Sequence, residues 1–152
     1  MQKIRVLLAD DHTIVLEGLK KILEPAFELV GTVDNGRDLV DETLKLRPDV
    51  IVVDISMPLL NGIEAVRRIK TELNRVKVIF LTMHPDVSYA SMAFNIGASG
   101  YVLKNSASRE LHTAINEVMK GGTYVTPLIA GELMQKLKQF QPGDNSFKVK
   151  LT

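Results

Sequence analysis

The sequence predicts an α/β fold, a doubly wound parallel sheet with helices on both faces. Apolar runs of four to six residues alternate with segments of helical periodicity, which is typical of buried parallel strands joined by crossover helices. Several of these runs end directly on a polar residue, and the carboxyl ends of parallel strands lie along one edge of their sheet. The chain is therefore expected to bring distant polar side chains together.

The first strand and the first helix are predicted within the first 25 residues. Residues 4–9 form the strand, and the apolar residues that follow recur at helical spacing from Val15 to Leu23. Pro25 ends this helix because proline cannot continue the hydrogen-bond pattern.

A second strand, a second helix and a third strand come next. Residues 27–32 are predicted as the strand, and Asn35 is a candidate N-cap for a helix over residues 36–46. That helix must end before Pro48, because the residue preceding a proline avoids the helical conformation. Residues 50–53 form the third strand.

The third and fourth helices flank the fourth strand. Asn61 and Glu64 have the spacing of a capping pair for a helix whose apolar residues fall within residues 63–73. The fourth strand covers residues 76–81. A helix over about residues 86–96 follows and stops at the next glycine.

The fifth strand covers residues 100–103, and residues 111–119 carry the apolar stripe of a fifth helix. Two glycines at residues 121–122 end that helix. The count of five strands and five helices predicts one domain over residues 1–121.

Residues 122–152 are predicted to be a linker helix with a tail. Thr126-Pro127 is a typical capped helix start, and the composition of residues 141–146 is that of a linker. The apolar residues on one face of this helix are Ile129, Leu133, Leu137 and Phe140. Such a stripe needs a surface to pack against.

The composition excludes several classes of site. The chain has no cysteine, so it has no disulfide and no thiolate metal site. Its net charge of +1 gives no general attraction to nucleic acid, and its first apolar stretch is too short for a signal segment or a membrane span. We expect a soluble, cytoplasmic protein with no membrane partner.

Charged and hydroxyl-bearing side chains follow four of the predicted strands. They are Asp10, Asp11, Asp54, Thr82 and Lys104. Two negative charges about 4 Å apart repel by roughly 4 kcal/mol at an effective dielectric constant near 20. Lys104 offsets one charge, and Mg²⁺, which prefers carboxylate, carbonyl and water oxygens, would offset the rest. The alternative for Asp10 or Asp11 taken singly is a cap of the first helix.

Asp54 follows a fully apolar strand and is expected to project into the crevice at the sheet edge. A carboxylate in such a place can attack phosphorus when a metal and cationic groups neutralise the transferring oxygens, or it can serve only as a cap or metal ligand. Thr82 is either an ordinary strand residue or a partner of a phosphate oxygen. Lys104 is either solvated or a partner of both carboxylate and phosphoryl groups.

The chain resembles the receiver domain of bacterial two-component response regulators across about residues 3–120. The matching segments are Leu-Leu-Ala-Asp-Asp-His at 7–12, Val-Asp-Ile-Ser-Met-Pro at 53–58, Asn-Gly-Ile-Glu-Ala at 61–65, Leu-Thr at 81–82 and Gly-Ala-Ser-Gly-Tyr-Val-Leu-Lys at 97–104. The resemblance implies a flavodoxin-like (βα)5 fold with strand order 2-1-3-4-5.

The resemblance also implies a role for each residue of the constellation. Asp54 matches the phosphoacceptor. The residues that match ligands of Mg²⁺ (or Mn²⁺) are Asp11 and Asp54 directly, Asp10 through water and Ser56 through its carbonyl. Thr82 and Lys104 match the residues that bind the phosphoryl group. Thr82 and Tyr101 match the switch pair. Ser56 and His84 match the positions that tune the rate of dephosphorylation.

The resemblance is to the NarL/FixJ subfamily, whose LuxR-type helix-turn-helix domain begins with Leu-Thr, as residues 151–152 do. It implies a sensor histidine kinase as phosphodonor, a phosphorylation-linked homodimer, and DNA binding only through the absent C-terminal domain. A natural stand-alone receiver is the alternative. Many receivers have a cis-proline after the lysine, whereas this chain has Asn105 there.

Two other functions compete with the switch. A haloacid-dehalogenase-like phosphohydrolase also uses an aspartate nucleophile, but it has a second aspartate two positions later, where this chain has Ser56. A degenerate receiver that only binds partners is the other alternative, and the complete set of acids, threonine and lysine argues against it. We therefore expect no turnover of a free substrate, only catalysis of the chain's own phosphorylation and dephosphorylation.

Overall fold

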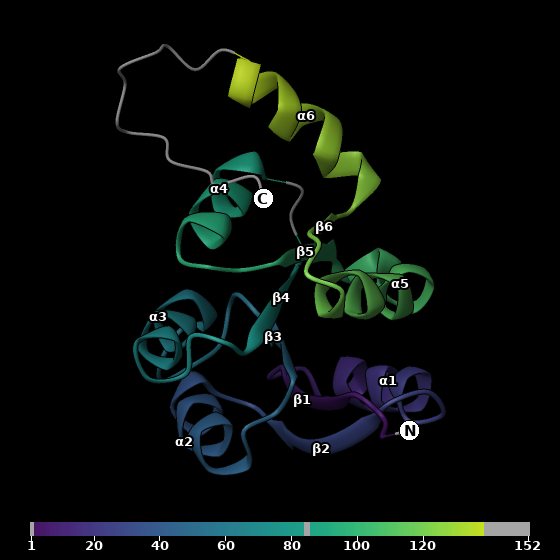
Figure 1. Ribbon diagram of the computed structural model, residues 1–152, viewed down its shortest axis with the longest axis vertical. Helices are drawn as coiled ribbons and strands as arrows, with labels where there is room; N and C mark the ends of the chain where they lie inside the picture. The colour runs from purple at the N-terminus through teal and green to yellow at the C-terminus, as the bar shows by residue number, and fades with distance from the viewer. Residues whose placement is uncertain (1, 84–85, 139–152) are drawn as a thin grey trace.

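The computed structural model describes residues 2–83 and 86–138. Its strands form one sheet in the order β2-β1-β3-β4-β5-β6, and each neighbouring pair is parallel (Figure 1). The strands are β1 (Arg5–Ala9), β2 (Glu28–Val33), β3 (Val50–Asp54), β4 (Lys77–Thr82), β5 (Gly100–Leu103) and β6 (Tyr124–Val125). The predicted order of the first five strands is confirmed.

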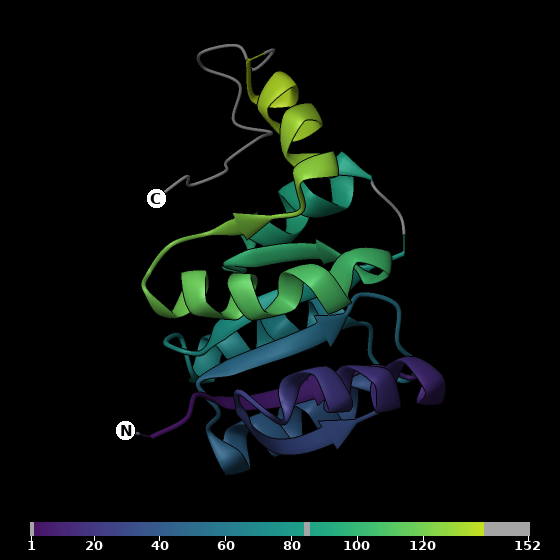
Figure 2. The same cartoon turned by 90° about the vertical axis from the view of Figure 1, so that its right-hand side faces the viewer.

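Helices cover both faces of the sheet. They are α1 (Thr13–Leu23), α2 (Gly36–Leu46), α3 (Gly62–Glu72), α4 (Val87–Asn95), α5 (Ala107–Met119) and α6 (Pro127–Lys138), with a short 3-10 helix η1 (Lys104–Ser106) after β5. Figure 2 shows α1 and α5 side by side on one face, and Figure 1 shows α2 and α3 on the other. This is the doubly wound arrangement that the alternating pattern predicts.

Two apolar clusters, one on each face, hold the helices to the sheet. Strand residues alternate between them, so that Ile51 and Val53 lie in the cluster with α2, α3 and α4, whereas Val50 and Val52 lie in the cluster with α1 and α5. All four side chains are fully buried. Burying one such side chain contributes about 1.5 to 3 kcal/mol, which explains why these runs are continuously apolar.

Side-chain caps start three of the helices, two of them at the asparagines that the sequence predicts as caps. Asn35 accepts a hydrogen bond from the Asp38 N–H (2.8 Å), and Asn61 accepts one from the Glu64 N–H (2.9 Å). Asp86, at the start of α4, accepts from Ser88 (2.8 Å). A cap satisfies a backbone donor that the helix leaves free, so these residues fix where the loops after the strands end.

The segment after residue 121 extends the sheet, which the sequence did not predict. Tyr124 and Val125 form β6, which pairs with β5, and α6 packs against α4 with Ile129 and Leu133 buried. A strand of two residues is too short to show any periodicity in the sequence. The predicted helix is present as α6, its role as a linker stays a prediction, and Phe140 lies outside the described residues.

Thr126 attaches this segment to the domain. Its hydroxyl oxygen accepts a hydrogen bond from the Leu103 N–H (3.0 Å) and donates to Glu110 Oε1 (3.0 Å), and its own N–H donates to the Tyr101 carbonyl (3.0 Å). Tyr124 also donates to Glu110 (2.8 Å). The segment is therefore bound to the backbone immediately before Lys104.

Across residues 2–83 and 86–138, none of the helices has the length and apolar character that crossing a membrane requires.

Candidate functional site

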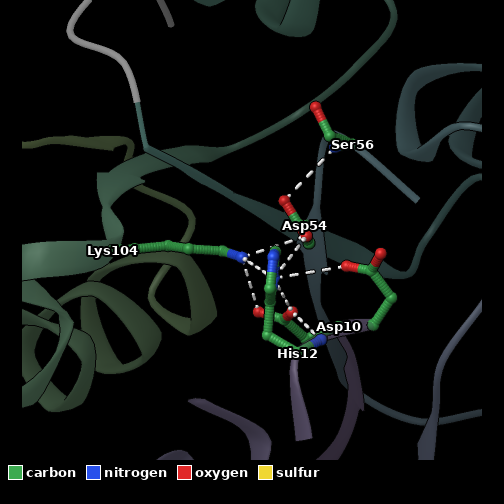
Figure 3. A network of polar contacts seen from close by, with 6 residues as sticks. Asp10, His12, Asp54, Ser56 and Lys104 are labelled. Carbon is green, nitrogen blue, oxygen red and sulfur yellow. Dashed lines mark hydrogen bonds and ion pairs between the residues drawn. The ribbon is translucent and has the colours of Figure 1, made fainter. Parts of the chain in front are cut away.

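Three side chains from three separate strands meet at the carboxyl edge of the sheet. Asp10 follows β1, Asp54 ends β3 and Lys104 follows β5. The Lys104 Nζ lies 2.9 Å from Asp10 Oδ2 and 3.0 Å from Asp54 Oδ2 (Figure 3). The structure thus brings together Asp10, Asp54 and Lys104, which the sequence predicts to converge.

The backbone holds both carboxylates in place. Asp10 is fully buried, its N–H donates to the Val33 carbonyl (3.0 Å), and its Oδ1 accepts from the His12 N–H (2.8 Å). Asp54 is 3% exposed and its Oδ1 accepts from the Ser56 N–H (3.2 Å). The alternative role for Asp10 as a cap of α1 is not found, because α1 begins without a side-chain cap bond.

Close packing behind Asp54 leaves room only for a glycine at residue 62. A Cβ built at Gly62 would lie 2.4 Å from the Asp54 carbonyl oxygen. The Gly62 N–H also donates to the Ile55 carbonyl (2.9 Å), which closes the loop between β3 and α3. This loop holds the carboxylate of Asp54 at the site.

Burial and charge act in opposite directions on the ionisation of the site. Burial raises the pKa of Asp54 to about 6, Lys104 partly opposes this shift, and Asp10 adds to it. Burial lowers the pKa of Lys104, but its contacts with Asp10 and Asp54 more than offset this, so the lysine pKa lies above its ordinary value. Near neutral pH the Asp54 carboxylate is therefore mostly ionised and faces the ammonium of Lys104.

His12 is a member of the site that the sequence reasoning missed. Its Nδ1 lies 3.0 Å from Asp10 Oδ1, 3.3 Å from Asp11 Oδ1 and 3.8 Å from Asp54 Oδ2. It also lies 3.1 Å from the Lys104 Nζ. Its position directly after two aspartates at a strand end was the available signal, but the direction of its ring depends on the backbone turn into α1.

The donor set fits a divalent cation. One ligand atom from each of Asp10, Asp11, His12 and Asp54 lies within 4.8 Å of the others. Three of these groups are carboxylates, which Mg²⁺ prefers, and they face only one ammonium within ion-pair distance in the described part of the chain. Asp11 and His12 are exposed, so the cluster is open to solvent.

Thr82 and Tyr101 occupy the neighbouring strands β4 and β5. Thr82 is 5% exposed and ends its strand in register with Leu103, one residue before Lys104. Tyr101 is fully buried, and burial raises its pKa to about 12 while a contact with the Thr82 side chain opposes that shift. The two predicted switch residues are therefore near one another, with the tyrosine turned inward.

Two other predictions concern residues around the site. His84 lies outside the described residues, so its predicted role in dephosphorylation stays a prediction. The described residues contain no cis peptide bond, and the peptide between Lys104 and Asn105 is trans. The lysine reaches the carboxylates in this geometry, as the first residue of the short helix η1.

Comparison with known proteins assigns a family to this architecture. A family model described as the response regulator receiver domain matches residues 6–116. The transcriptional regulatory protein DegU of Brevibacillus brevis is 39% identical over 139 residues, which are 90% of this chain and 59% of DegU. The chain thus spans less than two thirds of that relative's length.

Solved structures agree with this match. The crystal structure of a LuxR-family two-component response regulator from Aurantimonas sp. SI85-9A1 has a TM-score of 0.86 at 33% identity, covering 91% of this chain and all of that one. The RcsB response regulator of Salmonella typhimurium, in a structure concerned with DNA interaction, has a TM-score of 0.81 at 30% identity, covering 88% of this chain and 68% of that one.

Proposed function

This chain belongs to the response regulator receiver domain family, and we propose that it is a phosphorylation-dependent switch with Asp54 as its phosphoacceptor. The observation that carries this proposal is the pair of contacts from Lys104 Nζ to Asp10 Oδ2 and Asp54 Oδ2. They hold a buried carboxylate beside a cation at the end of β3, which is the environment that an aspartate nucleophile requires.

The proposed chemistry is one transfer of a phosphoryl group. A carboxylate oxygen of Asp54 attacks the phosphorus of a phosphohistidine or of acetyl phosphate, and the bond from phosphorus to the donor's nitrogen or oxygen breaks. The electron pair of that bond leaves with the imidazole or the acetate. Because the pKa of Asp54 is about 6, most of the carboxylate is ionised at neutral pH and can attack. Lys104 then holds a phosphoryl oxygen in place of the carboxylate charge that was consumed.

A divalent cation completes the proposed site. The residues proposed to hold Mg²⁺ (or Mn²⁺) are Asp11, Asp54 and the Ser56 carbonyl directly, with Asp10 acting through water. When bound, this ion supplies charge neutralisation for the transferring oxygens. The fit rests on the three carboxylates gathered at one edge with a single ammonium within ion-pair distance among the described residues.

Thr82 and Tyr101 are proposed to pass the phosphorylation signal on to α4 and β5. The hydroxyl of Thr82 moves toward a phosphoryl oxygen and binds it, and this movement of Thr82 changes the packing around Tyr101. β6 and Thr126 contact Tyr101 through backbone hydrogen bonds. Residues 1–121 act as the receiver, and residues 122–152 connect it to an output domain of the kind that longer LuxR-family relatives contain. The proposed partners are a sensor histidine kinase, a second copy of the chain, and DNA only through that output domain.

Phosphoryl labelling tests the proposal directly. The protein is incubated with Mg²⁺ and acetyl phosphate, and its intact mass is measured. We expect one added phosphoryl group on the wild type, none on Asp54→Asn, and none when a chelator removes the metal. Asp41→Asn, which removes an exposed carboxylate of α2, is the matched control and should be labelled like the wild type.

Two outcomes would contradict the proposal. Equal labelling of Asp54→Asn would reject Asp54 as the acceptor. Continuous release of phosphate from unrelated phosphate esters would favour a hydrolase, because a receiver turns over only its own aspartyl phosphate.

A further inference from the structure

The imidazole of His12 faces the acidic site and has no part in the function proposed above. Its Nδ1 lies within 3.0 to 3.8 Å of one oxygen from each of Asp10, Asp11 and Asp54 (Figure 3). The described histidine elsewhere in the chain behaves differently, because His112 packs its ring on Phe27 at 5.4 Å between centroids. The His12 ring is 55% exposed, so an ion from solvent can reach it.

His12 contacts the start of α1 through its backbone and not through its ring. His12 is the residue before α1, and its N–H is already bound to Asp10 Oδ1. The ring makes no cap bond to α1, so it is not needed at the helix start. Nδ1 lies 3.1 Å from the Lys104 ammonium, which can only donate, and 3.0 Å from Asp10 Oδ1, which can only accept, so its role depends on the tautomer of the ring. With its proton on Nε2, the ring presents the Nδ1 lone pair to the site.

The spacing of the donor atoms matches the edge of a metal coordination shell. Zinc-type ions bind nitrogen and carboxylate oxygen at about 2.0 to 2.2 Å, which places neighbouring ligand atoms about 3.0 Å apart in an octahedron and about 3.4 Å apart in a tetrahedron. The three separations from His12 Nδ1 to carboxylate oxygens span these values. A nitrogen and several oxygens are therefore already arranged as ligands of one small cation.

We propose that His12 is a nitrogen ligand in this site, so that it binds Zn²⁺, Co²⁺ or Ni²⁺ and these ions compete with Mg²⁺. The proposal rests on the metal site of the proposed function and adds His12 to it. Imidazole suits these borderline cations, which rank above Mn²⁺ in affinity for nitrogen ligands, whereas Mg²⁺ keeps oxygen ligands and water. The identity of the bound cation would then affect the phosphorylation of Asp54.

Calorimetric titration of the whole chain with Mg²⁺, Co²⁺ and Zn²⁺ tests the proposal through affinity alone. In His12→Gln we expect the affinity for Co²⁺ and Zn²⁺ to fall at least about tenfold, since loss of even an outer-shell partner of a ligand costs 10- to 100-fold. The affinity for Mg²⁺ should stay nearly unchanged, because the carboxylates remain. A thermal melting curve of the variant shows whether it folds like the wild type.

A second measurement needs no variant. Nitrogen-15 NMR of the wild-type imidazoles during Zn²⁺ addition should shift the Nδ1 resonance of His12 and leave both resonances of His112 in place. An unchanged His12 Nδ1, or an equal loss of affinity for Mg²⁺, Co²⁺ and Zn²⁺ in His12→Gln, would overturn the proposal.

Phosphoryl labelling separates this inference from the proposed function. If the wild type takes up a phosphoryl group in the presence of Mg²⁺, but His12→Gln has the same relative affinities for the three metals as the wild type, only the proposal that His12 is a metal ligand fails. If the wild type takes no phosphoryl group, the proposed function fails whatever the titrations show.

Discussion

Lys104 and Asp54 form an ion pair of 3.0 Å although their strands are not neighbours. β5 and β3 are separated by β4, so two strand spacings of about 4.8 Å each lie between their backbones. The long side chain of the lysine bridges this distance, and its Nζ also lies 2.9 Å from Asp10, which follows β1. One ammonium therefore connects three strands at the carboxyl edge of the sheet.

Replacing Lys104 with methionine, which keeps the length of the side chain, should destabilise the protein. Asp10 and Asp54 are 0% and 3% exposed, and the variant would leave both without their cation. Removing one partner of a buried ion pair costs about 3 to 5 kcal/mol. Urea unfolding in metal-free buffer at pH 7 measures the loss, and Lys45→Met, at the exposed end of α2, is the control. Equal losses in the two variants would show that the ion pair contributes nothing.

The stability of the metal-free protein should fall as the pH rises from about 4 to about 6. The pKa of Asp54 is raised from 3.8 to about 6 in the folded chain, so the native state binds more protons than the unfolded state in this window. The Asp54→Asn variant should not show this fall in stability, because its side chain at residue 54 does not ionise. It should be more stable than the wild type at pH 7 by up to roughly 3 kcal/mol, since one pKa unit corresponds to about 1.4 kcal/mol.

Unfolding curves from pH 3.5 to 7.5 with a chelator present check this pH dependence. The difference between Asp54→Asn and the wild type should nearly disappear below pH 4, where both carry a neutral side chain at residue 54. A difference that does not change with pH would show that it arises from packing and not from ionisation.

Thr126→Val should loosen the attachment of β6 and α6. The valine has no oxygen to accept from the Leu103 N–H, and a buried donor without a partner costs about 1 to 3 kcal/mol. Hydrogen exchange of the backbone amides in residues 124–135 should become faster than in the wild type. Thr113→Val, at an exposed position of α5, should leave this exchange unchanged. Unchanged exchange in Thr126→Val would mean that apolar packing of α6 alone holds the segment.

Two glycine substitutions should act in opposite directions. A Cβ at Gly36 would lie 1.8 Å from the Leu60 carbonyl oxygen, so Gly36→Ala must displace the loop before α3 and should destabilise the protein by more than about 2 kcal/mol. Gly18 lies inside α1 with no atom within 4 Å of such a Cβ. Gly18→Ala should stabilise by about 0.5 to 1 kcal/mol, because alanine loses less backbone entropy in a helix. Melting temperatures of the two variants measure both effects, and a stable Gly36→Ala protein would contradict the close approach to Leu60.

The elements that the sequence predicts correctly are those with strong local signals. Asn35 and Asn61 are recognisable as helix caps because each side chain accepts a hydrogen bond from an N–H only three residues later. Such a contact depends only on residues that are close in sequence. The buried strands are recognisable because both of their faces are covered, so each contains a continuous apolar run. β6 has neither signal, since its two residues become a strand only through pairing with β5.

The residues of the site follow from the sequence, whereas their contacts do not. Asp10, Asp54 and Lys104 each directly follow or end a predicted strand, so the chain order alone assigns them to one edge of the sheet. Only the folded chain shows that a single ammonium touches both carboxylates and that the His12 ring turns toward them. Strand patterns depend on residues close in sequence, but side-chain distances depend on how strands from residues 5 to 103 pack together, and that long-range packing is set by the tertiary structure.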